Sequence, residues 1–309
     1  MQASMHTTSA LNPKARKTKT EIHILNFAKI KERMRRVLPQ VITQRWEVMV
    51  QLRGMERVKT LSCDASNLRR FDEAALGRLF ASEENEISWL DAAKKVEALG
   101  IPDGTGGVNP GDRRALYYLI KGMQASSALE FGTHIGASTV HIAWALSAQH
   151  SKHEGRAKLI TVDIKDVNDP VRKPWLEYGA KYSPAELLNE VGVGSMVEFV
   201  TETSLCYLGR CERKFDFIFL DGDHSAEVVY HEIPAALKLL NQNGVILLHD
   251  YFPDLRPLWS EGSMLPGPFL AVERLRKEGV NVVAKPLGKL PWPTKFDSNV
   301  TSLALLLRE

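Results

Sequence analysis

The sequence has few cysteines and no long apolar run. Its 309 residues include three cysteines, Cys63, Cys206 and Cys211, and none are spaced as C-x-x-C. Three cysteines are too few, and an odd number, for a disulfide framework, so the sequence predicts a reducing, cytoplasmic setting. No apolar stretch approaches the ~20 residues that span a bilayer. Residues 1–20 are basic but lack the apolar segment of a secretory signal, so we expect a disordered tail, with a mitochondrial transit peptide as the alternative.

Neither sign of charge dominates the composition. Charged residues make up 25% of the chain, and the formal net charge is +3. A nucleic-acid partner requires basic residues gathered on one face of the protein. A net charge of +3 gives no clear sign of such a partner. Hydrophobic residues make up 44%, which is enough for one large core or for one domain with an accessory region.

The first hundred residues have helical periodicity and no strand alternation. From about residue 21 to residue 55 apolar side chains recur mostly at intervals of three and four, which predicts an amphipathic helix that Pro39 bends or breaks. A second helix is predicted from about residue 71 to residue 99, and a turn-rich linker follows it. We expect residues 21–106 to form a helical region that covers a binding site or makes a dimer contact.

After residue 106 short apolar strands alternate with helices. Strands are predicted at 128–131, 159–164, 196–200, 215–220, 245–248, 280–284 and 302–307. Intervening helices produce parallel βαβ units with right-handed crossovers. Residues 107–309 are therefore predicted to be a doubly wound α/β domain with a mostly parallel, seven-stranded sheet. Only a loop separates the last two strands, so the final strand should run antiparallel.

The first candidate ligand motif follows the strand at 128–131. Residues 129–139 read LEFGTHIGAST, so Glu130 precedes glycines at 132 and 136. Glycines let a backbone approach a ligand closely, and a helix N-terminus attracts an anionic group. A dinucleotide loop would read G-x-G-x-x-G instead. An acid before the loop repels a pyrophosphate but suits the ammonium of a methionine moiety. At the end of the next strand, Asp163 can accept hydrogen bonds from both ribose hydroxyls.

Ionisable side chains gather after two later strands. Asp221, Asp223 and His224 follow one of them, and His249 and Asp250 follow the next. Neighbouring parallel strands bring their carboxyl ends to the ligand-binding edge of an open sheet. Asp221 and Asp250, with either His249 or Asp223, could hold a hard cation such as Mg²⁺. Asp223 and His224 are also candidates for a general base.

These motifs resemble those of class I S-adenosylmethionine-dependent methyltransferases, notably the catechol O-methyltransferase-like and macrocin O-methyltransferase-like branches. The resemblance rests on residues 129–139, 219–227 and 247–251, and it covers about residues 107–308. It implies that S-adenosylmethionine is the cofactor. The residues that it implies for cofactor binding are Glu130, Gly132, Thr133, Gly136, Ser138, Asp163, Thr203, Ser204 and Asp221.

The resemblance also implies a metal site and a base. Asp221 and Asp250 match the metal-binding aspartates of the family, and Asp223 matches the proposed base of the sugar-directed branch. His224 occupies the position of the catalytic lysine of the catechol branch. The family usually has an oxygen ligand beside Asp250, whereas this chain has His249. A histidine ligand would favour a divalent ion other than Mg²⁺ or would leave the coordination shell.

The sequence as a whole predicts methyl transfer from S-adenosylmethionine to a hydroxyl oxygen of a small molecule, assisted by a divalent metal. One alternative is a metal-independent methyltransferase that acts on nitrogen or on a macromolecule. Another is a non-catalytic protein that keeps the fold. A Rossmann oxidoreductase is disfavoured because the G-x-G-x-x-G motif is missing. We expect no membrane attachment, and the N-terminal helices offer a contact for a homo-oligomer.

Overall fold

The computed structural model describes residues 39–70, 72–148 and 158–308. The tail predicted at 1–20 and most of the first predicted helix lie outside these ranges. Helix α2 (Gln40–Glu56) begins directly after Pro39. It crosses the boundary between two compact units, residues 1–46 and 47–309, and the description below concerns the second unit. Among the described residues, no helix combines the length and the apolar character needed to cross a membrane.

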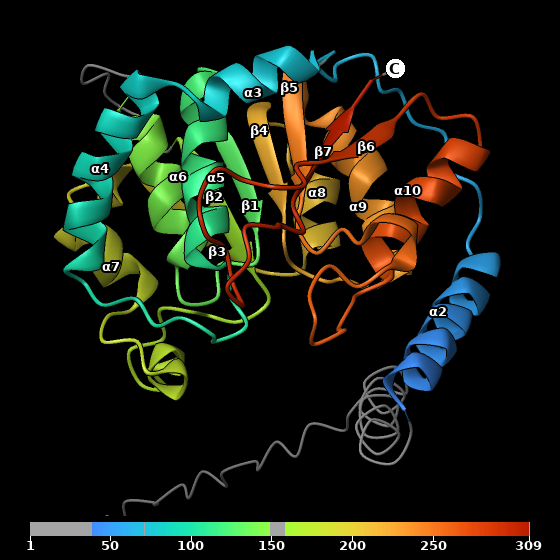
Figure 1. Cartoon of the computed structure of the whole chain (residues 1–309), viewed down its shortest axis with the longest axis horizontal. Coiled ribbons are helices and arrows are strands. Elements are labelled where there is room, and N and C mark those ends of the chain that lie inside the picture. Colours follow the sequence, from blue (N-terminus) through green and yellow to red (C-terminus); the bar gives the residue numbers. More distant parts are fainter. Residues whose placement is uncertain (1–38, 71, 149–157, 309) are drawn as a thin grey trace, which may run out of the picture. The chain divides into compact units, whose positions relative to one another are not determined.

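Seven strands form a single sheet in the order β3-β2-β1-β4-β5-β7-β6 (Figure 1). Their bounds are β1 (Ala128–Phe131), β2 (Leu159–Asp163), β3 (Val197–Thr201), β4 (Phe215–Leu220), β5 (Leu240–Leu248), β6 (Val283–Pro286) and β7 (Ala304–Leu307). Neighbours among β1 to β5 pair in parallel, whereas β7 runs antiparallel to both β5 and β6. The predicted fold class and the antiparallel last strand are confirmed. The reason is the missing crossover helix between β6 and β7.

Helices cover both faces of this sheet (Figure 1). One layer contains α3 (Glu73–Phe80), α4 (Glu83–Glu97), α5 (Pro110–Gly122), α6 (Ala137–Ser147) and α7 (Pro184–Glu190), and the other contains α8 (Ser204–Arg210), α9 (Ala226–Lys238) and α10 (Gly267–Lys277). Three short 3₁₀ helices lie in loops: η1 (Pro174–Tyr178), η2 (Gly194–Met196) and η3 (Pro253–Leu255). Along β4, Phe217 and Phe219 face the first layer, whereas Ile218 and Leu220 face the second. A strand that is buried on both faces is apolar at nearly every position, which explains why Asp216 is the single polar residue of β4.

The N-terminal region differs from its prediction in two places. The helix predicted from 71 to 99 is divided into α3 and α4, because the Ser82 hydroxyl caps α4 by accepting a hydrogen bond from the backbone N–H of Asn85 (3.3 Å). Residues 57–70 are irregular rather than helical, and Leu68 forms a parallel bridge with Gly244. Side chains of α3 and α4 enter the same core as those of α5 and α6. Their role as a cap or dimer contact stays a prediction.

Candidate active site

A pocket of about 620 Å³ opens at the carboxyl ends of β1, β2 and β4. The sheet order changes direction between β1 and β4, and open α/β sheets bind their ligands at such a switch point. The predicted site residues that line the pocket are Gly132, Asp163, Thr203, Ser204, Asp223 and His224. Ile164 and Leu205, which the sequence did not mark, add exposed apolar walls to it.

Gly132 allows the ends of β1 and β4 to approach each other. Its φ is +95°, and a Cβ at this position would clash with the carbonyl oxygen of Asp221. Gly136 has a φ of +78° and is the N-cap of α6. Both glycines of the predicted motif are therefore required by the backbone, since side chains rarely tolerate these angles. Gly136 does not itself line the pocket.

Asp163 fixes the loop that forms one side of the pocket. Its Oδ2 accepts a hydrogen bond from the backbone N–H of His134 (3.0 Å), and its Oδ1 accepts one from that of Lys165 (2.9 Å). Each carboxylate oxygen has a further lone pair, so Asp163 can still accept hydrogen bonds from a ligand in the pocket. The Thr203 hydroxyl caps α8 by accepting from the backbone N–H of Cys206 (3.3 Å).

Glu130 lies beneath the glycine loop and does not line the pocket. Its side chain is fully buried, and three hydroxyls donate to its carboxyl group: Ser138 to Oε1, and Thr139 (2.6 Å) and Thr161 (2.7 Å) to Oε2. Burial raises the pKa of Glu130 to about 7, although the three hydroxyl donors act in the opposite direction. Neither Glu130 nor Ser138, both predicted to contact the cofactor, lines the pocket, because the two side chains bind each other. Thr133 is also buried and pairs with the Thr161 hydroxyl (2.6 Å).

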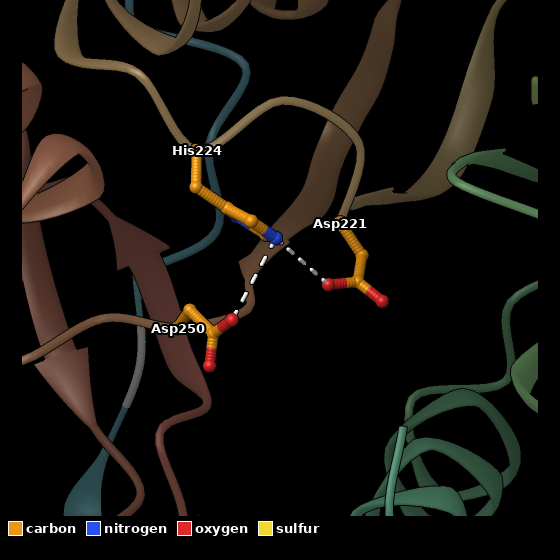
Figure 2. A group of neighbouring side chains, drawn as sticks. All are labelled: Asp221, His224 and Asp250. Atoms are coloured by element: carbon orange, nitrogen blue, oxygen red, sulfur yellow. Dashed lines mark ion pairs between the residues drawn. The ribbon is translucent and has the colours of Figure 1, made fainter. Parts of the chain in front are cut away.

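Asp221, His224 and Asp250 converge at the ends of the neighbouring strands β4 and β5 (Figure 2). His224 Nε2 lies 3.8 Å from Asp221 Oδ1 and 3.6 Å from Asp250 Oδ2. One ligand atom from each of the three residues lies within 4.8 Å of the others. These separations are too long for hydrogen bonds, and they suit a cation bound between the three atoms.

Asp250 is charged within this cluster. Burial works against its carboxylate, but the imidazoles of His249 and His224 lower the pKa of Asp250 below its ordinary value. Its Oδ1 accepts a hydrogen bond from the Ser302 hydroxyl (3.2 Å), which leaves Oδ2 towards His224. The cluster therefore offers a fixed carboxylate oxygen beside an imidazole nitrogen.

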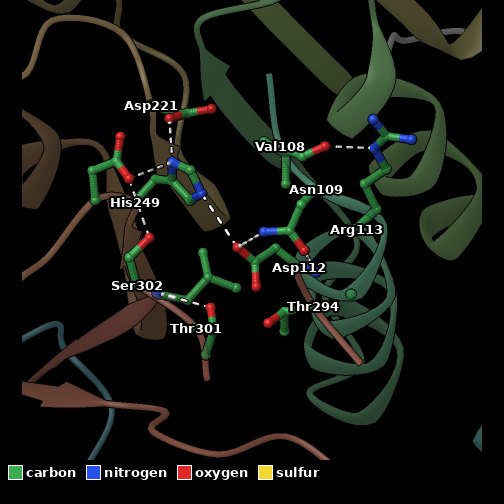
Figure 3. Close-up of polar contacts among 12 residues, drawn as sticks. Val108, Asn109, Asp112, Arg113, Asp221, His249, Thr294, Thr301 and Ser302 are labelled. Carbon is green, nitrogen blue, oxygen red and sulfur yellow. Dashed lines mark hydrogen bonds and ion pairs between the residues drawn. The ribbon is translucent and has the colours of Figure 1, made fainter. Parts of the chain in front are cut away.

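His249, which was predicted as a metal ligand, is instead held between carboxylates (Figure 3). Its Nδ1 lies 2.8 Å from Asp221 Oδ1, and its Nε2 lies 3.4 Å from Asp112 Oδ2. Burial disfavours the imidazolium, but the carboxylates of Asp221, Asp250 and Asp112 raise the pKa of His249 well above its ordinary value. An imidazolium has no lone pair for a metal. His249 as a metal ligand stays a prediction, and the three residues whose ligand atoms converge include His224 in its place.

Asp112 was missed by the sequence reasoning. It lies in the first turn of α5 and is fully buried, and its Oδ2 accepts a hydrogen bond from the Asn109 side-chain amide (2.6 Å). An acid in a first helical turn is ordinary, so nothing in the sequence distinguished it. Asp223, which was predicted as a base, lines the pocket but is not part of the three-residue cluster, and its role stays a prediction. Its Oδ1 accepts from the backbone N–H of Ser225 (2.7 Å).

The strand order, the pocket at the switch point and the acids after β2, β4 and β5 define a class I methyltransferase fold. The family that matches the sequence is described as a methyltransferase domain, and the match covers residues 129–251. Residues 129–251 are therefore similar to a methyltransferase domain, and the strand order around them is that of the class I methyltransferase fold. Among curated proteins, none matches the sequence.

Several solved structures share the architecture at low identity. The O-methyltransferase from Bacillus cereus, in complex with SAH, is 18% identical, with a TM-score of 0.46 over 86% of this chain and 100% of its own. TomG from Streptomyces achromogenes, an O-methyltransferase involved in tomaymycin synthesis, is 20% identical, with a TM-score of 0.45 over 86% and 98%. SAH-bound PaMTH1 of Podospora anserina is 15% identical, with a TM-score of 0.45 over 82% and 100%.

Proposed function

We propose that the domain transfers the methyl group of S-adenosylmethionine to a hydroxyl oxygen of a small molecule. The observation that carries this proposal is that His224 belongs to two sites at once. It lines the 620 Å³ pocket, and it belongs to the cluster with Asp221 and Asp250. A donor in the pocket would therefore lie beside groups that can orient a hydroxyl and accept its proton.

The pocket offers suitable partners for each part of the donor. The Asp163 carboxylate can accept hydrogen bonds from the ribose hydroxyls, and Ile164 and Leu205 provide apolar walls for the adenine ring. Gly132 permits close backbone approach, as its φ of +95° requires glycine. Glu130 supports the loop from below rather than contacting the donor. The bound sulfonium supplies the leaving group, so the protein has to align the acceptor and exclude water.

Asp221, His224 and Asp250 fit a divalent cation. When bound, such a cation lowers the pKa of an acceptor hydroxyl. Two carboxylates and one imidazole suit ions such as Mn²⁺ or Zn²⁺ better than Mg²⁺, which prefers oxygen ligands. Without a cation, His224 is the group placed to accept the proton, because its Nε2 faces a carboxylate on each side. Asp223 is the alternative base, since it lines the same pocket.

The first test separates donor binding from transfer. Calorimetric titration with S-adenosylhomocysteine should show saturable binding, and a labelled-donor assay over a panel of hydroxyl compounds should show transfer. Absence of donor binding would overturn the proposal as a whole. Transfer to amines in place of hydroxyl compounds would favour the nitrogen-directed alternative.

The second test concerns the cluster. Asp250→Asn should reduce turnover by about 10²–10⁴-fold, the range for loss of an activating group, while donor affinity stays within about threefold. Asp254→Asn, an exposed aspartate four residues further on, is the matched control and should retain activity. Chelation should reduce turnover of the native protein. If turnover survives both chelation and Asp250→Asn, the cation is excluded, and His224→Ala against Asp223→Asn then identifies the base.

A further inference from the structure

A second cavity, of about 310 Å³, lies apart from the donor pocket. It is bounded by α4, by the loop that follows α4, by the first turn of α5, and by the N-terminal half of α6. Trp89, Val96 and Ile101 provide apolar walls. Two polar side chains also line it although both are almost fully buried, namely Arg113 (6% exposed) and His141 (5% exposed). Buried polar groups normally have hydrogen-bond partners. The donors and acceptors of Arg113 and His141 that lack a partner therefore indicate what the cavity can bind.

His141 presents a hydrogen-bond acceptor to the cavity. Its Nδ1 lies 2.6 Å from the carbonyl oxygen of Ala137, which requires the proton on Nδ1. Burial lowers the pKa of His141 to about 3, so the ring is neutral at physiological pH. Its Nε2 then carries a lone pair and has no hydrogen-bond partner in the described part of the chain. The ring itself is held against Trp89, with centroids 5.5 Å apart and planes at 29°.

Arg113 presents donors to the same cavity. Its Nε donates to the carbonyl oxygen of Val108 (2.6 Å), and its Nη1 forms an ion pair with Asp103 (3.1 Å). No partner within residues 39–70, 72–148 or 158–308 accounts for the Nη2 donors. Asp103 balances the charge of Arg113, and Glu97 lines the cavity as well. An anionic ligand would therefore be disfavoured.

We propose that this cavity binds a neutral phenol. A phenolic hydroxyl is both a donor and an acceptor, so it can donate to His141 Nε2 and accept from Arg113 at the same time. The ring would lie on the apolar wall formed by Trp89, Val96 and Ile101. The volume is sufficient for one substituted ring.

The proposal is tested by ¹⁹F NMR titration of the full chain with 4-fluorophenol and with fluorobenzene, which lacks the hydroxyl. We expect saturable binding of 4-fluorophenol in the millimolar range, at least about tenfold tighter than that of fluorobenzene, since one buried hydrogen bond is worth about a factor of ten. Equal affinity for the two probes, or no saturable shift, would overturn the proposal.

Two variants locate the binding. Ala93→Phe fills the cavity and should weaken 4-fluorophenol binding at least about tenfold. Ala98→Phe, at an exposed position beyond the same helix, should leave it unchanged. His141→Phe keeps an aromatic ring beside Trp89 but removes the acceptor, so the preference for 4-fluorophenol over fluorobenzene should disappear. Binding that persists unchanged in both Ala93→Phe and His141→Phe would place the phenol elsewhere.

Discussion

Replacement of Glu130 by glutamine should remove a pH dependence of folding stability. The carboxyl group is fully buried, and its pKa of about 7 stands above its ordinary value of 4.5. Folding therefore disfavours the charged form. The contribution to stability is complete below about pH 4.5 and is lost as the pH rises towards 7. This difference in pKa corresponds to about 3 kcal/mol of unfolding free energy.

Urea denaturation of the native protein and of Glu130→Gln at pH 5 and at pH 8 measures this effect. Glutamine preserves the shape of the side chain, and the hydroxyls of Ser138, Thr139 and Thr161 can rotate to match its amide. Between the two pH values the native protein should lose about 2.5 kcal/mol more than the variant. Glu232, another buried carboxyl with a pKa of about 7, is present in both proteins, so its effect cancels.

Equal losses in the two proteins would refute the reasoning. They would mean that the three hydroxyl donors outweigh burial, and that Glu130 is already charged at pH 5. Glu130→Ala supplies an independent check, because it removes the shared acceptor of three buried hydroxyls. It should cost about 3 kcal/mol or more at pH 5, and about 2.5 kcal/mol less than that at pH 8, because the native protein has lost the contribution of the protonated carboxyl there.

Three further predictions concern the loop, the donor and the ion pair. Gly132→Ala should abolish binding of S-adenosylhomocysteine, measured by calorimetry, and should lower stability by about 1–3 kcal/mol, measured by thermal denaturation. Gly209→Ala is the control and should change neither quantity, because a Cβ at position 209 meets nothing within 4 Å. Asp163→Ala should weaken binding of the same ligand at least about tenfold, and a change below twofold would exclude its role with the ribose. Asp112→Ala should cost about 3–5 kcal/mol in urea denaturation, because it leaves His249 without one of its buried partners; a loss under about 1 kcal/mol would show that the ion pair is weak.

The sheet could be predicted from the sequence, and so could the strand ends at which the pocket opens. The strands at 128–131 and 215–220 were predicted with the bounds that the structure has, because each is a mostly apolar segment that ends at a glycine or an aspartate. The missing crossover helix was enough to predict the antiparallel last strand. Asp163, Asp221 and Asp250 could be marked as candidate site residues because the carboxyl ends of parallel strands reach one edge of the sheet. Local pattern and chain connectivity carry all of this information.

The tertiary structure alone decided what each ionisable side chain contacts. His249 and His224 both lie near Asp221. Only the fold shows that Asp112, more than a hundred residues away in sequence, lies beside the Nε2 atom of His249. The histidine that converges with Asp221 and Asp250 as a candidate metal ligand is His224. Likewise, Glu130 turns away from the pocket because three hydroxyls from β2 and α6 surround it. Such assignments depend on the direction of a side chain and on the charge of partners that are distant in sequence. Neither periodicity nor motif spacing encodes the direction or the charge of a side chain. The pKa of a side chain and the availability of its lone pairs depend on its neighbours in space.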